Sequence, residues 1–120
     1  MSYKVKIDQQ AVNALLSAVQ PALEQTAEAL YEEVLDAGVI PDDTGELRDS
    51  GHIEVFGGTD NAVAIVSDAP YAGRLYFHPE LDFHAPGAKA FWYEDWLPGG
   101  SREGRAAELF AEHYKAEAGV

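Results

Sequence analysis

The stretch of sequence that decides the fold class is HIEVFGGTDNAVAIV, residues 52–66. Its two flanks, 52–56 and 62–66, are rich in apolar and β-branched side chains, as strands are. The residues between them, GGTDN at 57–61, tolerate the positive φ angles of a hairpin loop. We therefore expect an antiparallel β-hairpin, whose inward positions are Ile53, Val55, Val63 and Ile65.

Helical periodicity dominates the chain before the hairpin. Asp8 predicts an N-cap and Gly38 a C-terminal stop of one long helix, which we expect to run to about Ala37. Pro21 predicts a kink or break near residues 19–20. The helix has an apolar stripe and, largely outside it, acidic residues. The stripe comprises Val12, Leu15, Leu16, Val19, Leu23, Leu30 and Val34, and the acids are Glu24, Glu28, Glu32 and Glu33.

The segment ahead of this helix alternates in a different way. Tyr3, Val5 and Ile7 fall on one side of an extended chain, and Lys4 and Lys6 fall on the other. This period-two pattern is typical of a half-buried strand. We therefore expect a short strand over residues 3–7.

Shorter elements are expected after the long helix. A helical turn over 46–50 would be capped by Thr44, and short helices are expected over 71–77, which Pro70 starts, and over 91–97. Residues 78–89 form a loop. Ser101 would cap a last helix that buries Ala106, Leu109, Phe110 and Tyr114. The prediction is a single α+β domain over residues 1–120, in which a long N-terminal helix packs on a small antiparallel sheet with a β-hairpin, with short helices and a C-terminal helix.

The chain is strongly acidic, with 21 acidic and 8 basic residues and a net charge of -13. Such an excess repels phosphate and disfavours nucleic-acid binding through a basic patch. An effect on solubility or salt tolerance explains the charge equally well. The absence of cysteine excludes disulfides and thiolate chemistry. No apolar run approaches the roughly 20 residues of a membrane helix, so we expect no membrane span.

Enzymatic motifs are weak. Ser50, Ser67 and Ser101 lie in turn or cap contexts rather than in a glycine-flanked nucleophile elbow. The glycines at 57–58 lack the Lys and Ser/Thr of a phosphate-binding loop. We expect neither an enzyme nor a cofactor. HPELDFH at 78–84 could hold zinc if the loop folded back, but a polar surface loop explains it as well.

Aromatic side chains concentrate in one part of the chain. Phe91, Trp92 and Tyr93 are consecutive, so one short helix cannot bury all three on one face. Exposed aromatics beside irregular backbone are typical of protein–protein interfaces, which favours an assembly component. Of the 13 aromatic residues, those between positions 71 and 96 are Tyr71, Tyr76, Phe77, Phe83, Phe91, Trp92, Tyr93 and Trp96.

The order of these motifs resembles the minor capsid or tail-completion proteins, the head–tail joining proteins of tailed bacteriophages. The resemblance rests on PDDTGELRDS at 41–50, the hairpin after it, and SDAPYAGRLYFHPE at 67–80. The long first helix, Trp92, DWL at 95–97 and the closing helix with Phe110 and Tyr114 fit the same pattern. The resemblance therefore covers about the whole chain.

This resemblance implies a structural virion protein, made in the host cytoplasm, that forms a ring, generally a hexamer, at the head–tail junction. The implied partners are further copies of the chain and neighbouring neck, tail-terminator and tail-tube proteins. Genome DNA would pass through the ring without specific binding, and no membrane is involved. The implied interface residues are Arg48, Tyr71, Arg74, Tyr76, Phe77, His78, Glu80, Trp92, Tyr93 and Trp96, with Gly58 and Asp60 at the hairpin tip.

Two alternatives stay open. Arg48 would pair with an acid of its own chain or of a neighbour, or remain solvated. A different class of protein, a small soluble bacterial binding or regulatory domain, would use a metal at His78, Glu80, Asp82 and His84.

Overall fold

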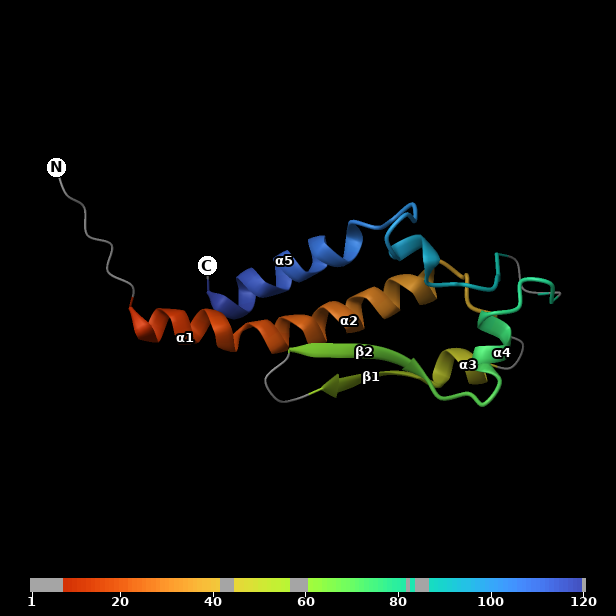
Figure 1. Cartoon of the computed structure of the whole chain (residues 1–120), viewed down its shortest axis with the longest axis horizontal. Coiled ribbons are helices and arrows are strands. Elements are labelled where there is room, and N and C mark those ends of the chain that lie inside the picture. Colours follow the sequence, from red (N-terminus) through yellow and green to blue (C-terminus); the bar gives the residue numbers. More distant parts are fainter. Residues whose placement is uncertain (1–7, 42–44, 57–60, 82, 84–86, 120) are drawn as a thin grey trace.

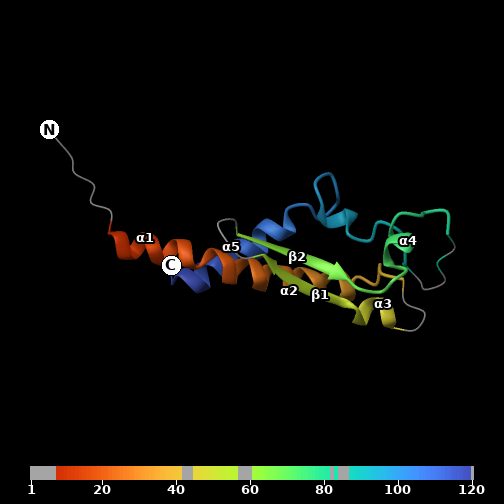
Figure 2. The ribbon, with the colours of Figure 1, turned by 60° about the horizontal axis from the view of Figure 1, so that its bottom comes forward.

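The computed structural model describes residues 8–41, 45–56, 61–81, 83 and 87–119. Its elements form three layers along one axis, with α2 (Val19–Asp36) in the middle (Figure 1). The helix α5 (Arg105–Ala118) runs antiparallel to α2 on one side, and the hairpin lies along the other side. Figure 2 shows the same hairpin following α2 in a second view. This architecture confirms the predicted α+β fold class.

The long N-terminal helix is a bent rod made of α1 (Gln9–Ser17) and α2, which meet at Ala18. The Asp8 carboxylate accepts a hydrogen bond from the Gln10 amide at 2.9 Å, which confirms the predicted N-cap. The predicted break is also present, one residue early. Pro21 lies in the first turn of α2, where its missing N–H breaks no helical bond. Past the other end of α2, Gly38 adopts a φ of +70°, as expected of a helix stop.

The predicted hairpin is confirmed as the antiparallel pair β1 (Gly51–Phe56) and β2 (Ala62–Ser67). Ile53 lies opposite Ile65, and Val55 lies opposite Val63. Val63 and Ile65 line an apolar cavity together with residues of α2, so the inward prediction holds for β2. It fails for Val55, which is 50% exposed because α2 covers β2 more than β1.

The remaining elements are α3 (Glu46–Asp49), α4 (Ala72–Tyr76) and the 3₁₀ helix η1 (Glu94–Trp96). The helix expected over 91–97 is reduced to η1 because Phe91 adopts a φ of +49°, outside the right-handed helical region. Ser101 does not cap α5, since turns continue to the N-cap Gly104. The predicted strand over 3–7, the Thr44 cap and most of the hairpin loop lie outside the described residues.

The main apolar cluster of the core lies at one end of the molecule, where α2 meets α3, α4 and η1. Its large members are Tyr31, Val34, Ile40, Leu47, Trp92 and Trp96. None of the residues of α1, all of which are described, is buried, and Leu15 and Leu16 of the predicted stripe are 38% and 65% exposed. The stripe is therefore buried only along α2, and the far end of the rod has no core beneath it.

Two reciprocal hydrogen bonds fasten α2 to α3. The Tyr31 hydroxyl donates to the Arg48 carbonyl at 2.7 Å, and Arg48 Nη2 donates to the Leu35 carbonyl at 2.8 Å. Burial raises the pKa of Tyr31, so the phenol stays protonated and able to donate. Gly51 allows this arrangement, because a Cβ atom there would lie only 1.8 Å from the Tyr31 hydroxyl oxygen.

Gly51→Ala should therefore destabilise the protein by about 1–3 kcal/mol, through crowding and loss of the Tyr31 hydrogen bond. Gly73→Ala is the matched control, since a Cβ atom there meets nothing within 4 Å in the helix α4. It should be neutral or stabilise by about 0.5–1 kcal/mol. Urea denaturation measures both. Equal stability of the two variants would contradict the close fit between Gly51 and Tyr31.

Candidate interaction surfaces

An aromatic cluster extends from the core to the surface at the α4 end of the molecule. The Tyr76 ring makes edge contacts with Trp92, Phe77 and Phe91, at centroid distances of 4.7, 5.0 and 5.6 Å. Trp92 is 2% exposed, whereas Phe77 is 64% exposed. Burial raises the pKa of Tyr76. The buried rings thus hold Phe77 at the surface as an apolar contact point.

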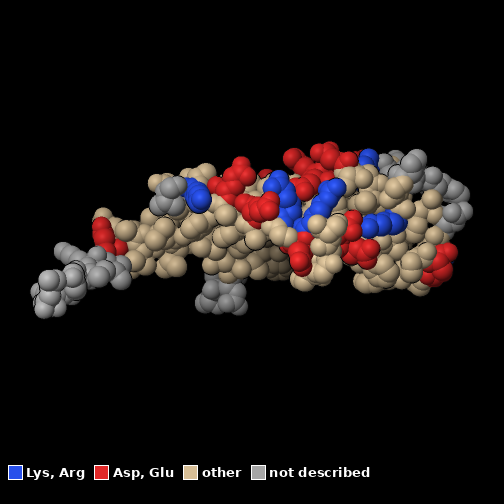
Figure 3. Space-filling model, turned by 90° about the horizontal axis from the view of Figure 1, so that it is seen from above, with Lys and Arg blue, Asp and Glu red and all other residues tan. Residues whose placement is uncertain are grey.

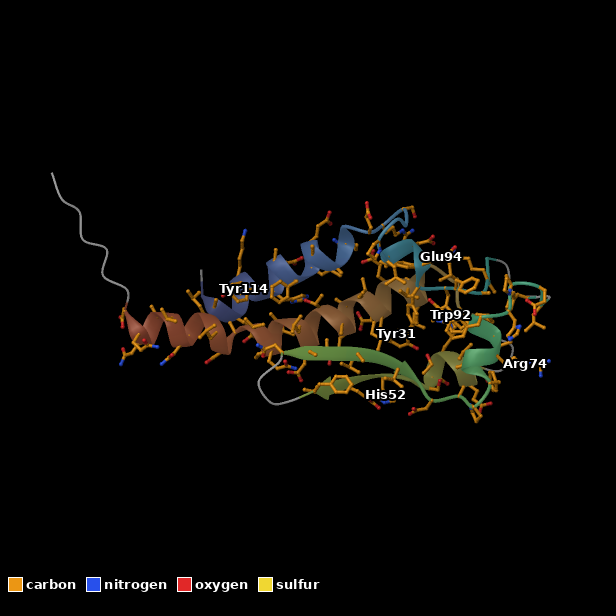
Figure 4. All side chains as sticks on the ribbon, viewed as in Figure 1. Tyr31, His52, Arg74, Trp92, Glu94 and Tyr114 are labelled. Carbon is orange, nitrogen blue, oxygen red and sulfur yellow. The ribbon has the colours of Figure 1, made fainter. Side chains whose placement is uncertain are left out.

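Four of the predicted interface residues are exposed on or just after α4: Arg74, Phe77, His78 and Glu80. Figure 4 shows Arg74 pointing outward at the end of the molecule opposite α1. His78 Nδ1 lies 2.7 Å from a Glu80 carboxylate oxygen. A backbone hydrogen bond and this imidazole hold the pKa of Glu80 below its usual value. These residues form one exposed patch, which we call the α4 patch.

The other predicted interface residues have contacts within the chain. Trp92 and Trp96 are buried, and Tyr93 is half-buried beside Trp92. Arg48 binds the C-terminal end of α2, and the Tyr71 hydroxyl donates to Glu46 at 3.3 Å. These side chains hold the α4 patch in place, and the described structure presents none of the tryptophans at a surface. Gly58 and Asp60 lie outside the described residues.

Glu33 is the joint between α2, η1 and α5. One of its carboxylate oxygens accepts from Arg105 Nε at 2.8 Å, and the other accepts from Trp96 Nε1 at 3.4 Å. The Arg102 guanidinium lies 5.0 Å from the centroid of the Trp96 ring. Burial alone would raise the pKa of Glu33, but the hydrogen bonds from Arg105 and Trp96 outweigh it, and the pKa is lowered.

Two uncovered apolar places were missed by the sequence analysis. One is α1, with Leu15 and Leu16, and the other is the end of β1, where Val55 and Phe56 are each 50% exposed. The sequence did contain a signal for the exposed side of α1. The apolar stripe continues on the N-terminal side of the predicted break, where no second helix was expected to cover it. Tyr114 of α5 contacts α1 through its hydroxyl, which donates to the Leu15 carbonyl at 3.1 Å.

An apolar cavity of about 370 Å³ lies between α2, β2 and the segment that carries η1. Leu23, Leu30, Val63, Ile65 and Trp96 are among the residues that line it. Its wall is mostly apolar, and the side chains of Thr26, Tyr76 and Tyr93 supply polar groups.

The charged side chains are distributed unevenly. Figure 3 shows acidic and basic residues interspersed on the face that carries α5. Lys89 pairs there with Asp95 at 3.1 Å, and Arg105 pairs with Glu33 and Glu108. By contrast, α2 contains acids and no base: Glu24, Glu28, Glu32, Glu33 and Asp36.

The described residues hold no group of three or more His, Asp or Glu side chains placed to bind a metal ion, and Asp82 and His84 of the suggested zinc cluster lie outside them. None of their helices is both long and apolar enough to span a membrane.

The lowered pKa of Glu33 predicts a loss of stability in acid. Because the folded-state pKa lies below the unfolded one, the contribution is complete above the unfolded pKa and is lost as the pH falls through the folded value. Glu33→Gln should cost roughly 1–2 kcal/mol at pH 7 and flatten the fall in stability below about pH 4.5. Glu32→Gln, at an exposed neighbouring position, is the control. Urea titrations from pH 7 to pH 3 measure both, and parallel pH profiles for wild type and Glu33→Gln would contradict the role of the joint.

Comparison of the chain with protein-family models, with curated proteins and with solved structures finds no match in any of the three.

Proposed function

We propose that this chain is a non-enzymatic structural protein that assembles with copies of itself into a ring at the neck of a tailed-phage particle. The observation that carries the proposal is the separation of uncovered apolar surfaces along an elongated chain. Leu16 of α1 is 65% exposed at one end, and Phe77 of the α4 patch is 64% exposed at the other. Covering such apolar side chains with a partner removes them from water and lowers the free energy of the system.

The placement of these surfaces favours a ring over a two-fold dimer. The two ends differ in sequence and shape, so contact between unlike ends of neighbouring copies is heterologous. A heterologous contact that rotates by a fixed angle closes into a ring. The resemblance of the 41–50 and 67–80 motifs to head–tail joining proteins supports the same proposal and supplies its location, the virion neck.

The acidic stripe of α2 suits the wall of a DNA channel. Glu24, Glu28, Glu32 and Asp36 follow one another at four-residue spacing, where like charges cost roughly 0.2–0.5 kcal/mol per pair. None of the four has an ion-pair partner among the described residues. An unneutralised acidic surface offers DNA no attractive phosphate contact, so the polymer would slide past without being retained.

Assembly is the direct test of the proposed function. The protein, alone or with the neighbouring neck and tail proteins, should give a discrete oligomer by light scattering and rings by electron microscopy. Phe77→Ser, which removes an exposed apolar contact without touching a fully buried side chain, should weaken that assembly by roughly tenfold. A strict monomer that remains monomeric with those proteins, and binds one zinc ion, would overturn the proposal.

The channel assignment predicts a defect in DNA release. Glu28→Lys with Glu32→Lys should slow genome ejection from assembled particles severalfold, because lysines in the wall bind phosphate. The substitutions make the pairs of positions 24–28 and 32–36 opposite in charge and leave the pair 28–32 like-charged, so folding stability should hold or rise by only about 0.2–0.5 kcal/mol. Glu112→Lys, on the exposed side of α5, is the control. Ejection at the wild-type rate in the double variant would count against the channel assignment.

A further inference from the structure

The hairpin has an open edge of the kind that accepts another strand. Within the described ranges the sheet has two strands, so the outer side of β1 has no paired neighbour. Glu54, Val55 and Phe56 are all exposed there, and the two apolar ones are 50% exposed. An exposed apolar edge strand is a ready template for pairing with another segment.

The two faces of this edge differ in chemistry. Ile53 and Val55 occupy the face shared with Val63 and Ile65, which is the apolar face toward α2. His52, Glu54 and Phe56 occupy the opposite face. There, His52 lies 3.4 Å from Glu54 and 3.3 Å from Asp68, so this face carries two carboxylates beside the half-exposed Phe56. A strand with one apolar side and one basic side therefore complements both faces of the β1 edge.

Residues 1–7 of the sequence have this pattern. Tyr3, Val5 and Ile7 form an apolar side, and Lys4 and Lys6, the only bases before Arg48, form the other. We infer that residues 1–7 of one copy add as a third strand to the β1 edge of a second copy. Val5 and its apolar neighbours would extend the Ile53 and Val55 face, and Lys4 and Lys6 would lie over Glu54 and Asp68. This rests on the self-assembly proposed above and adds to it a contact between residues 1–7 and the β1 edge.

The geometry of the rod directs the strand to another copy. Gln20 donates to the Ala62 carbonyl at 3.2 Å, and Ala62 pairs with Phe56, so the near end of β1 lies beside Gln20. Gln20 follows Asp8 by about 18 Å of helix, and Gly51 lies about 17 Å further along β1. Seven extended residues span only about 23 Å. The segment therefore cannot align with the β1 edge of its own chain.

The next element of the donor chain suits the same site. α1 follows the strand directly and buries none of its own residues, and it projects beyond the hairpin of its own chain (Figure 1). Leu15 and Leu16 would gain cover when the strand docks. Each copy then donates its residues 1–7 to one neighbour and accepts those of another, which is the heterologous connection that a ring requires.

A complementation experiment tests the contact with full-length chains. Val5→Lys spoils the apolar side of the donor strand, and Val55→Lys places a charge on the accepting edge, a substitution that its exposure allows. Each variant alone should self-associate at least roughly tenfold more weakly than wild type. Mixed, they should form a 1:1 complex, because one intact donor and one intact edge remain. Leu97→Lys, also at a 50% exposed apolar position, is the control and should assemble as wild type does.

Cross-linking gives an independent readout in a chain without native cysteine. Val5→Cys in one copy should be joined to Val55→Cys in another by a short thiol cross-linker, and not to Leu97→Cys. If wild type assembles while Val5→Lys, Val55→Lys and a variant lacking residues 1–7 assemble equally well, the strand inference is overturned and the proposed function stands. If the full chain never assembles, the proposed function fails first.

Discussion

The hydrogen bond from Tyr31 to the Arg48 carbonyl determines where the hairpin leaves the long helix. In the opposite direction, the Arg48 guanidinium donates to the Leu35 carbonyl. These two hydrogen bonds join α2 and α3. β1 begins three residues after Arg48, at Gly51, which packs against the Tyr31 ring because it has no side chain. The course of the hairpin along α2 follows from this junction. The core then closes over it with Trp92 and Trp96, and the aromatic cluster holds the α4 patch outward.

The sequence predicted the elements whose signal is local. The Asp8 cap, the break near Pro21, the stop at Gly38 and both strands are present because each depends on a few neighbouring residues. Predictions that depended on distant partners fared less well. The stripe of α1 has the right spacing for burial but leaves Leu15 and Leu16 exposed, and Val55 lies on the correct face of a strand that α2 covers less than it covers β2. Phe91 shortens a helix because three consecutive aromatics must point in different directions, and only the tertiary packing decides which of them is buried.

The same distinction applies to the predicted interface residues. The aromatic content indicated the correct region of the chain. It could not distinguish the buried side chains that support this surface from the side chains that are exposed on it. Trp92 and Trp96 are core residues, Arg48 is a helix cap, and Arg74, Phe77, His78 and Glu80 are exposed. Composition likewise gave a single net charge, whereas the structure separates a mixed face on α5, where Arg105 and Lys89 neutralise acids, from an unneutralised stripe on α2.

The main apolar cluster lies at one end of the molecule, so the elements at the other end bury little apolar surface of their own. The helix α1 has nine residues, too few for a stable helix in water without packing, and a two-stranded sheet is marginal alone. The hairpin gains one covered face from α2, while α1 buries none of its residues. Regions with few buried apolar contacts open at low free-energy cost. Covering α1 and the β1 edge in a neighbouring copy would therefore stabilise both the contact and the elements that make it.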